Sequence, residues 1–132
     1  MKKLSISLLL SILGSLLSLN SYAQNKQPDA PSLQVLQFHL EHRCVNCLRI
    51  EKFTRASLTK YFPGVSFELV NIEEKKNAKK AEEFQASGTA LYLYNPKTGK
   101  KKDLTASAFL NAGDEAKFEA ELKKAIEEFI KS

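Results

Sequence analysis

Short apolar runs and alternating patterns predict β-strands in three segments of the chain. Residues 33–40 (LQVLQFHL) form a mostly apolar run, which is typical of a strand covered on both faces. Residues 65–72 (VSFELVNI) alternate and carry β-branched and aromatic side chains. Residues 90–106 have an aliphatic and aromatic arm, a turn at 95–99 and a polar second arm. They predict a hairpin whose outer strand is protected from further pairing by lysines 100–102.

Apolar residues at three- and four-residue steps predict helices in three further segments. Residues 45–62 form the first, which a Pro-Gly pair ends, and residues 73–88 form a shorter one stopped by Gly88. Residues 114–130 begin with a candidate Asp N-cap. Their predicted buried stripe consists of Phe118, Leu122, Ala125, Ile126, Phe129 and Ile130. Residues 107–113 are ambiguous, with at most a helical turn expected there.

The predicted order is therefore βαβ, helix, ββ, helix. A helix that crosses between two strands implies that these strands pair in parallel, whereas the strands of a hairpin pair antiparallel. We expect a single α/β domain with a central mixed four-stranded sheet flanked by helices.

The N-terminus predicts a secretory signal peptide over residues 1–23. Two lysines precede an apolar stretch that is shorter than the roughly 20 residues needed to span a bilayer. Residues 21–23 (SYA) place small side chains where a signal peptidase acts, so we expect cleavage after Ala23. A flexible leader over 24–32 and a domain over 33–132 follow. The expected protein is exported, to a periplasm or outside the cell, and has no membrane span.

Composition excludes two other classes of protein. Removal of Lys2 and Lys3 with the signal peptide lowers the formal net charge from +5 to +3, and lysines and glutamates are interspersed, which is not a nucleic-acid-binding pattern. Removal of 23 of the 132 residues leaves 109, enough to bury a core without several disulfides. The chain has two cysteines, which is too few for a disulfide scaffold.

These two cysteines, Cys44 and Cys47, lie where the first strand meets the first helix. Positions i and i+3 in a first helical turn bring two sulfurs within bonding distance, and the free N–H groups there stabilise a thiolate. Cys44 is the expected nucleophile, and Cys47 is the expected buried resolving thiol. His42 and Arg43 directly precede the pair and are expected to favour the thiolate.

Three other roles are open for the pair. An inert disulfide would close a loop of only about four residues and stabilise the fold by roughly 2 kcal/mol, against nearly 5 kcal/mol for a loop of a hundred, so it would be a poor staple. A copper or zinc site could use Cys44, Cys47 and His42, with His39 nearby, although no second Cys-x-x-Cys pair exists. The domain could also be a catalytically silent subunit that binds a partner.

The element order and the place of the motif resemble the thioredoxin-like superfamily. More narrowly, FHLEHRCVNCLRIEKFT, followed by VNI and LYLY, is similar to secreted thioredoxin-like proteins of the nitrophenyl compound nitroreductase subunit family. The resemblance covers residues 35–130. It implies thiol–disulfide exchange with the thiols or disulfides of exported proteins. No cofactor is expected, because the chain has no flavin or nicotinamide fingerprint.

Two departures from the thioredoxin pattern concern the surroundings of the cysteines. The resemblance puts Thr89 or Ala90 at the substrate-facing position that a cis-proline normally takes. It puts Gln37 or Phe38 where thioredoxins have a buried acid, and neither can accept a proton at neutral pH. The resemblance therefore favours oxidation or slow exchange over efficient reduction of substrates.

Overall fold

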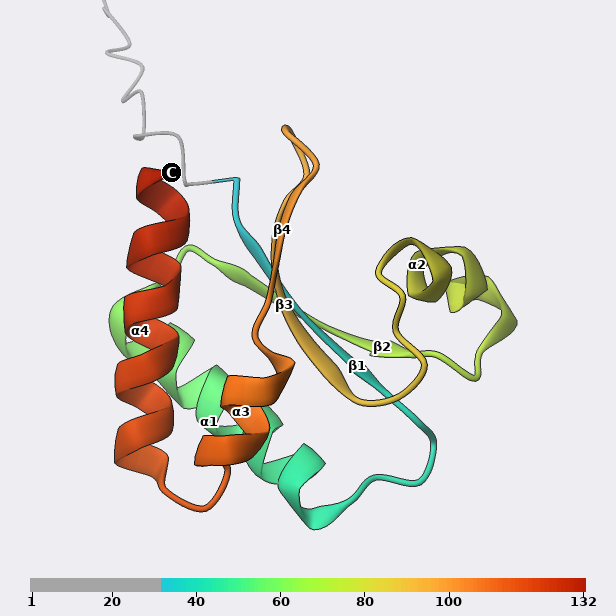
Figure 1. Cartoon of the computed structure of the whole chain (residues 1–132), viewed down its shortest axis with the longest axis horizontal. Helices are drawn as coiled ribbons and strands as arrows, with labels where there is room; N and C mark the ends of the chain where they lie inside the picture. Colours follow the sequence, from blue (N-terminus) through green and yellow to red (C-terminus); the bar gives the residue numbers. More distant parts are fainter. Residues whose placement is uncertain (1–31) are drawn as a thin grey trace, which may run out of the picture.

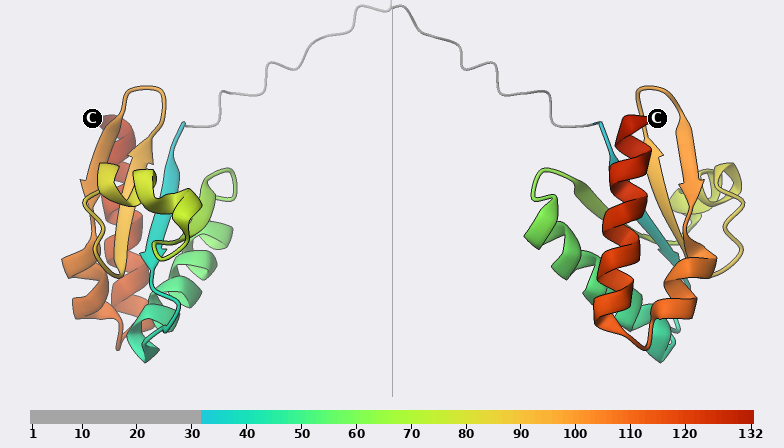
Figure 2. Two further views of the ribbon diagram at one scale, coloured as in Figure 1. Left: turned by 90° about the vertical axis from the view of Figure 1, so that its right-hand side faces the viewer. Right: turned by 60° about the vertical axis from the view of Figure 1, so that its left-hand side comes forward.

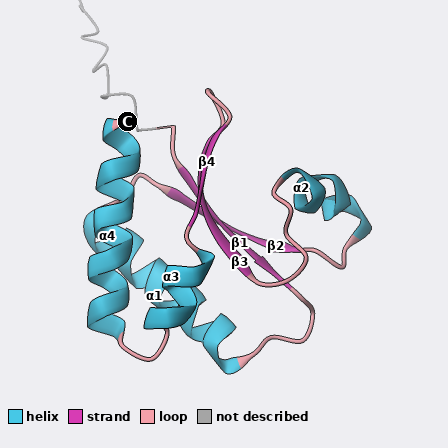
Figure 3. Cartoon of the chain, in the orientation of Figure 1, coloured by secondary structure: helices cyan, strands magenta, loops and turns pink. Residues whose placement is uncertain are grey.

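The computed structural model describes residues 32–132, so the predicted signal peptide and nearly all of the predicted leader lie outside the described residues. Figure 1 follows the chain through its elements, and Figure 3 separates helices from strands by colour. In chain order they are β1 (Gln34–His39), α1 (Val45–Tyr61), β2 (Ser66–Asn71), η1 (Lys75–Asn77), α2 (Ala78–Glu83), β3 (Ala90–Asn95), β4 (Lys100–Asp103), α3 (Thr105–Asn111) and α4 (Glu115–Lys131).

The four strands form one mixed sheet in the order β2-β1-β3-β4. β1 pairs in parallel with β2 and antiparallel with β3, and β3 pairs antiparallel with β4. The α/β class and the mixed four-stranded sheet predicted from the sequence are confirmed, and the layout is thioredoxin-like. β4, with its lysines, is an edge strand as expected.

Helices cover both faces of the sheet, with α1, α3 and α4 on one face and α2 on the other (Figures 1 and 2). The pleat of β1 explains how one strand serves both layers, because successive side chains point to opposite faces. Val35 packs with α1, α3 and α4, whereas Leu36 and Phe38 pack with Phe84 on the α2 side. Both faces of the central strand therefore carry buried apolar side chains.

Helix α1 begins directly after Cys44, which is its N-cap, and ends before Pro63, as predicted. Its buried residues are Cys47, Ile50, Phe53, Thr54, Ser57 and Leu58. Leu48, by contrast, is 49% exposed. It lies one position past Cys47, about 100° around the helix from the buried face.

Helix α4 begins as the sequence predicts, since the Asp114 carboxylate accepts the backbone N–H of Lys117 at 3.1 Å. Five of the six residues of the predicted stripe are buried. Ile130 is 46% exposed, which contradicts its place in that stripe. It follows Phe129, whose ring faces the core, and one residue turns an α-helix by about 100°.

Two elements differ from the prediction. Residues 105–111 form a whole helix, α3, where at most a helical turn was expected. Helix α2 ends at Glu83, before the predicted stop at Gly88, because the residues after Glu83 form a C-terminal cap. The backbone N–H of Ala86 donates to the carbonyl oxygen of Ala81 at 2.8 Å, with Gln85 in the left-handed region at φ 53°.

Candidate functional site

Cys44 and Cys47 form a disulfide across the first turn of α1, with an S–S distance of 2.07 Å and a Cα–Cα distance of 5.0 Å. The two sulfur-bearing residues differ in access to solvent. Cys44 is exposed at the helix start, whereas Cys47 is 5% exposed and belongs to the buried face of α1. An incoming molecule can therefore reach Cys44, while Cys47 lies beneath it.

The Cys44 sulfur accepts a hydrogen bond from the backbone N–H of Cys47, at 3.0 Å. This N–H is one of the groups that a helix leaves unpaired at its first turn, and it lies at the positive end of the helix dipole. No acidic residue lies in that turn to oppose the dipole. Once the disulfide opens, the same geometry stabilises a thiolate on Cys44.

The Cys47 sulfur lies 3.2 Å from the hydroxyl oxygen of Thr89, the residue immediately before β3. Of the two residues considered for the substrate-facing position, Thr89 is thus the one in contact with the pair. Ala90 is buried in the cluster on the α2 side of the sheet. All peptide bonds among residues 32–132 are trans, so the chain passes this point without the cis bond of the thioredoxin pattern.

Gln37, one of the two residues considered for the buried position beneath the pair, contacts the backbone of Cys47. Its side chain has no solvent exposure, and its Nε2 donates to the Cys47 carbonyl oxygen at 2.9 Å. Its Oε1 is buried without a hydrogen-bond partner. Phe38 points to the opposite side and packs against Phe84. The polar residues buried within 32–132 are Gln37, Thr54, Ser57 and Asn71, so none of them is a carboxylate.

Arg43 is held by a carboxylate. Its guanidinium donates to Glu51 Oε2 at 2.5 Å, and Glu51 Oε1 accepts from Arg55 at 2.9 Å. Burial raises the pKa of Glu51, but the hydrogen bonds and charges of the two arginines outweigh burial and lower this pKa below its ordinary value. The ion pair between Arg43 and Glu51 attaches the residue before Cys44 to α1. The Glu51 carboxylate also offsets the positive charge of Arg43, which was expected to favour the thiolate of Cys44.

Sequence reasoning missed Glu51 as a member of this site. The i,i+4 spacing of Glu51 and Arg55 is a signal for a pair on the helix surface. The pairing with Arg43 has no such signal, because Arg43 lies in the loop before the helix.

The two histidines near the cysteines have different surroundings. His42 is exposed, and His39 is half-buried with its Nδ1 2.9 Å from the carbonyl oxygen of Leu40. Among residues 32–132, no three His, Cys, Asp or Glu side chains come together in a way that could hold a metal ion. The described chain also contains no helix with the length and apolar character needed to cross a membrane.

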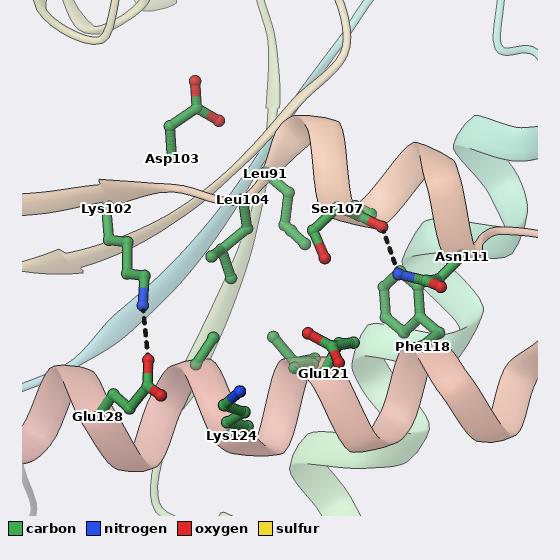
Figure 4. Close-up of a pocket in the computed structure, with 13 residues that line it drawn as sticks. Leu91, Lys102, Asp103, Leu104, Ser107, Asn111, Phe118, Glu121, Lys124 and Glu128 are labelled. Carbon is green, nitrogen blue, oxygen red and sulfur yellow. Dashed lines mark hydrogen bonds and ion pairs between the residues drawn. The ribbon is translucent and has the colours of Figure 1, made fainter.

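A cavity of about 290 Å³ lies away from the cysteines, between β4, α3 and α4 (Figure 4). Its floor is apolar and includes Leu91 and Phe118. Two contacts pair polar groups at its edge: Lys102 contacts Glu128 at 3.2 Å, and the Asn111 side chain donates to the Ser107 carbonyl oxygen at 2.9 Å. Neither cysteine lines this cavity, so it is separate from the disulfide site.

Comparisons with known proteins supply little beyond this geometry. No protein-family model matches the chain, and no curated protein matches it. A solved structure described as "Structure of a malarial protein" is 20% identical, with a TM-score of 0.42, over 60% of this chain and 93% of that one. The chemistry of the site therefore rests on its own residues.

Proposed function

We propose that this protein is an exported thiol–disulfide oxidoreductase in which Cys44 is the nucleophile and Cys47 the resolving thiol. One observation carries the proposal: an exposed sulfur at a helix N-cap is bonded to a buried sulfur one turn along. This arrangement presents one sulfur to other molecules and keeps its partner ready to close the pair again.

The exchange reaction runs through Cys44. A thiolate of a substrate protein attacks the Cys44 sulfur, the Cys44–Cys47 bond breaks, and its electron pair leaves on Cys47 as a thiolate. A mixed disulfide then joins the substrate to Cys44. A second substrate thiolate attacks the substrate sulfur of this bond and releases Cys44 as a thiolate. The substrate dithiol has become a disulfide, and the protein has become a dithiol.

The neutral surroundings of Cys47 support oxidation over reduction of substrates. In the reducing direction, Cys47 must lose a proton before it attacks the mixed disulfide. Gln37 occupies the place of a proton acceptor but cannot act as one. We accordingly assign the thiols of exported proteins as substrates. On the resemblance over residues 35–130, we also place the chain with the secreted thioredoxin-like proteins of the nitrophenyl compound nitroreductase subunit family.

Thiol alkylation in defined glutathione buffers tests the proposal. The folded mature protein is equilibrated at a series of ratios of reduced to oxidised glutathione, quenched with acid and labelled with a maleimide that shifts its mass. The pair should titrate as one two-electron couple, and Cys44 should be alkylated faster than a free cysteine at neutral pH. A disulfide that resists reduction in the folded state, or a Cys44 of ordinary reactivity, would refute the proposal.

Two variants separate the catalytic role from the silent-subunit alternative. Cys47→Ser should accumulate a mixed disulfide through Cys44, whereas the matched Cys44→Ser variant should form none and lose exchange activity. Full biological activity in Cys44→Ser would support a silent partner-binding subunit instead. Stoichiometric uptake of zinc or copper by the reduced wild-type protein would favour the metal-binding alternative.

A further inference from the structure

The two sulfurs of the disulfide have hydrogen-bond donors of different kinds. Cys44 accepts from a backbone N–H of its own helix, at 3.0 Å. Cys47 is 3.2 Å from the hydroxyl of Thr89, which is 42 positions away in the chain and reaches the sulfur from the segment before β3. The second contact therefore depends on one side chain and can be removed by one substitution.

In the structure, the neighbouring polar group, Gln37, donates to the backbone of Cys47 and not to its buried sulfur. The Nε2 of Gln37 is engaged by the Cys47 carbonyl oxygen at 2.9 Å. The remaining polar atom of that amide, Oε1, can only accept a hydrogen bond. A hydroxyl, by contrast, both donates and accepts, and it rotates to suit its partner. Thr89 is thus suited to hold the buried sulfur both as a thiolate and as a thiol.

We propose that Thr89 tunes the redox pair by donating its hydroxyl hydrogen bond to the thiolate that forms on Cys47 when the disulfide opens. This inference rests on the proposed function. In the step concerned, an external thiolate bonds to the Cys44 sulfur, the Cys44–Cys47 bond breaks, and the electron pair passes to Cys47. The Thr89 O–H bond stays intact, so no proton is transferred.

The direction of the effect follows from the acceptor strength of sulfur. A disulfide sulfur is a weak acceptor, and a thiolate carries a full charge, so the hydroxyl stabilises the open form more than the closed form. A leaving thiol with a lower pKa also leaves faster. Thr89 therefore makes the disulfide a stronger oxidant and makes attack on Cys44 faster.

Thr89→Val and Thr89→Ser form the test pair, because valine keeps the shape of threonine without the hydroxyl and serine keeps the hydroxyl. In Thr89→Val, reduction by dithiothreitol should slow several-fold, because Cys47 leaves as a thiolate. At a pH high enough to ionise Cys47, the equilibrium with glutathione should shift about tenfold toward the disulfide, which is about 30 mV for this two-electron couple. The shift should grow as pH rises, because the thiolate population grows. Thr89→Ser should stay within about twofold of wild type.

Thr59→Val is the matched control for the loss of a threonine hydroxyl. Thr59 is exposed on the same helix as Cys47 but 12 residues further along, about 18 Å at 1.5 Å per residue. This variant should match wild type in potential and rate. Circular dichroism reports whether each variant is folded, and Thr89→Ala replaces Thr89→Val if valine prevents folding.

The outcomes separate this inference from the function beneath it. If wild type exchanges with glutathione but Thr89→Val has the same potential and rate, the inference is wrong and the proposed function stands. Equal changes in the valine and serine variants would show that Thr89 acts through packing, which also refutes the inference. A wild-type disulfide that does not exchange would refute both.

Discussion

The side-chain amide of Gln37 donates a hydrogen bond to the carbonyl oxygen of Cys47, 2.9 Å away, inside a region closed to solvent. It anchors the backbone of the buried cysteine to the central strand of the sheet. Because the amide is neutral, it anchors Cys47 without offering a base. Gln37 thus supports the geometry of the cysteine pair but cannot accept a proton from Cys47.

Replacement of Gln37 by Glu should supply that acceptor. The buried carboxyl would have a raised pKa, because burial disfavours its charge. Stability should be close to wild type below about pH 4, the ordinary pKa range of Glu. It should be lost as pH rises through the higher folded-state value, by roughly 2 kcal/mol or more at pH 8. Reduction of an insulin-like disulfide substrate by the dithiol form should become faster.

Urea unfolding between pH 4 and pH 8 checks the stability change in Gln37→Glu. Gln37→Leu is the control: it removes one hydrogen bond but also one unpartnered oxygen, so its unfolding free energy should differ by about 1 kcal/mol at most and should not vary with pH. A pH-independent loss in the Glu variant would contradict the prediction.

Glu51→Gln should weaken the attachment of Arg43 to α1. The lowered pKa of Glu51 means that its contribution is present above the ordinary value of 4.5 and is lost as pH falls through the folded-state value. The site is partly solvated, so we expect a loss of about 1 kcal/mol at pH 7 and little difference from wild type at pH 3. Denaturant unfolding at both pH values measures it. Arg55→Gln, which removes the more exposed arginine, should cost less than Glu51→Gln at pH 7.

Gln85→Gly should stabilise the fold. Gln85 has φ 53°, a backbone conformation that favours glycine, at the end of α2. Relief of this strain exceeds the added flexibility of glycine in the unfolded chain, so we expect a gain of about 0.5 kcal/mol in thermal or urea unfolding. Gly99→Ala is the reverse control, because Gly99 has φ 74° and alanine there should destabilise by about 1 kcal/mol. A loss of stability in Gln85→Gly would show that the glutamine side chain outweighs the strain.

Thr54→Val should also stabilise the fold. Thr54 lies on the buried face of α1, and its hydroxyl oxygen is buried with no hydrogen-bond partner. Valine has the same shape, so the substitution removes an unpaired polar group without leaving a cavity, and we expect a gain of about 1 kcal/mol. Ser57→Ala on the same face is the comparison: the Ser57 hydroxyl donates to the Phe53 carbonyl oxygen at 2.8 Å, so that variant should gain nothing. Equilibrium unfolding in urea distinguishes the two.

The sequence by itself determined the features that depend on neighbours along the chain. Periods of two and of three to four residues located the strands and the long helices, and a carboxylate three residues before an unpaired N–H marked the start of α4. The spacing of Cys44 and Cys47 at a strand-to-helix junction was enough to predict that the two could bond. These are local interactions, and they need no knowledge of the remaining chain.

Only the tertiary structure decided which distant side chains surround the cysteines. The pleat of the strands turned Gln37 toward Cys47 and Phe38 away from it, and the approach of the segment before β3 put Thr89 on the buried sulfur. Adjacent residues on a strand face opposite sides, so a one-residue ambiguity in the sequence becomes a choice between the two layers. Packing of the sheet against α1 decides which of the two residues faces Cys47, because this packing buries the apolar residues of the sheet and of the helix.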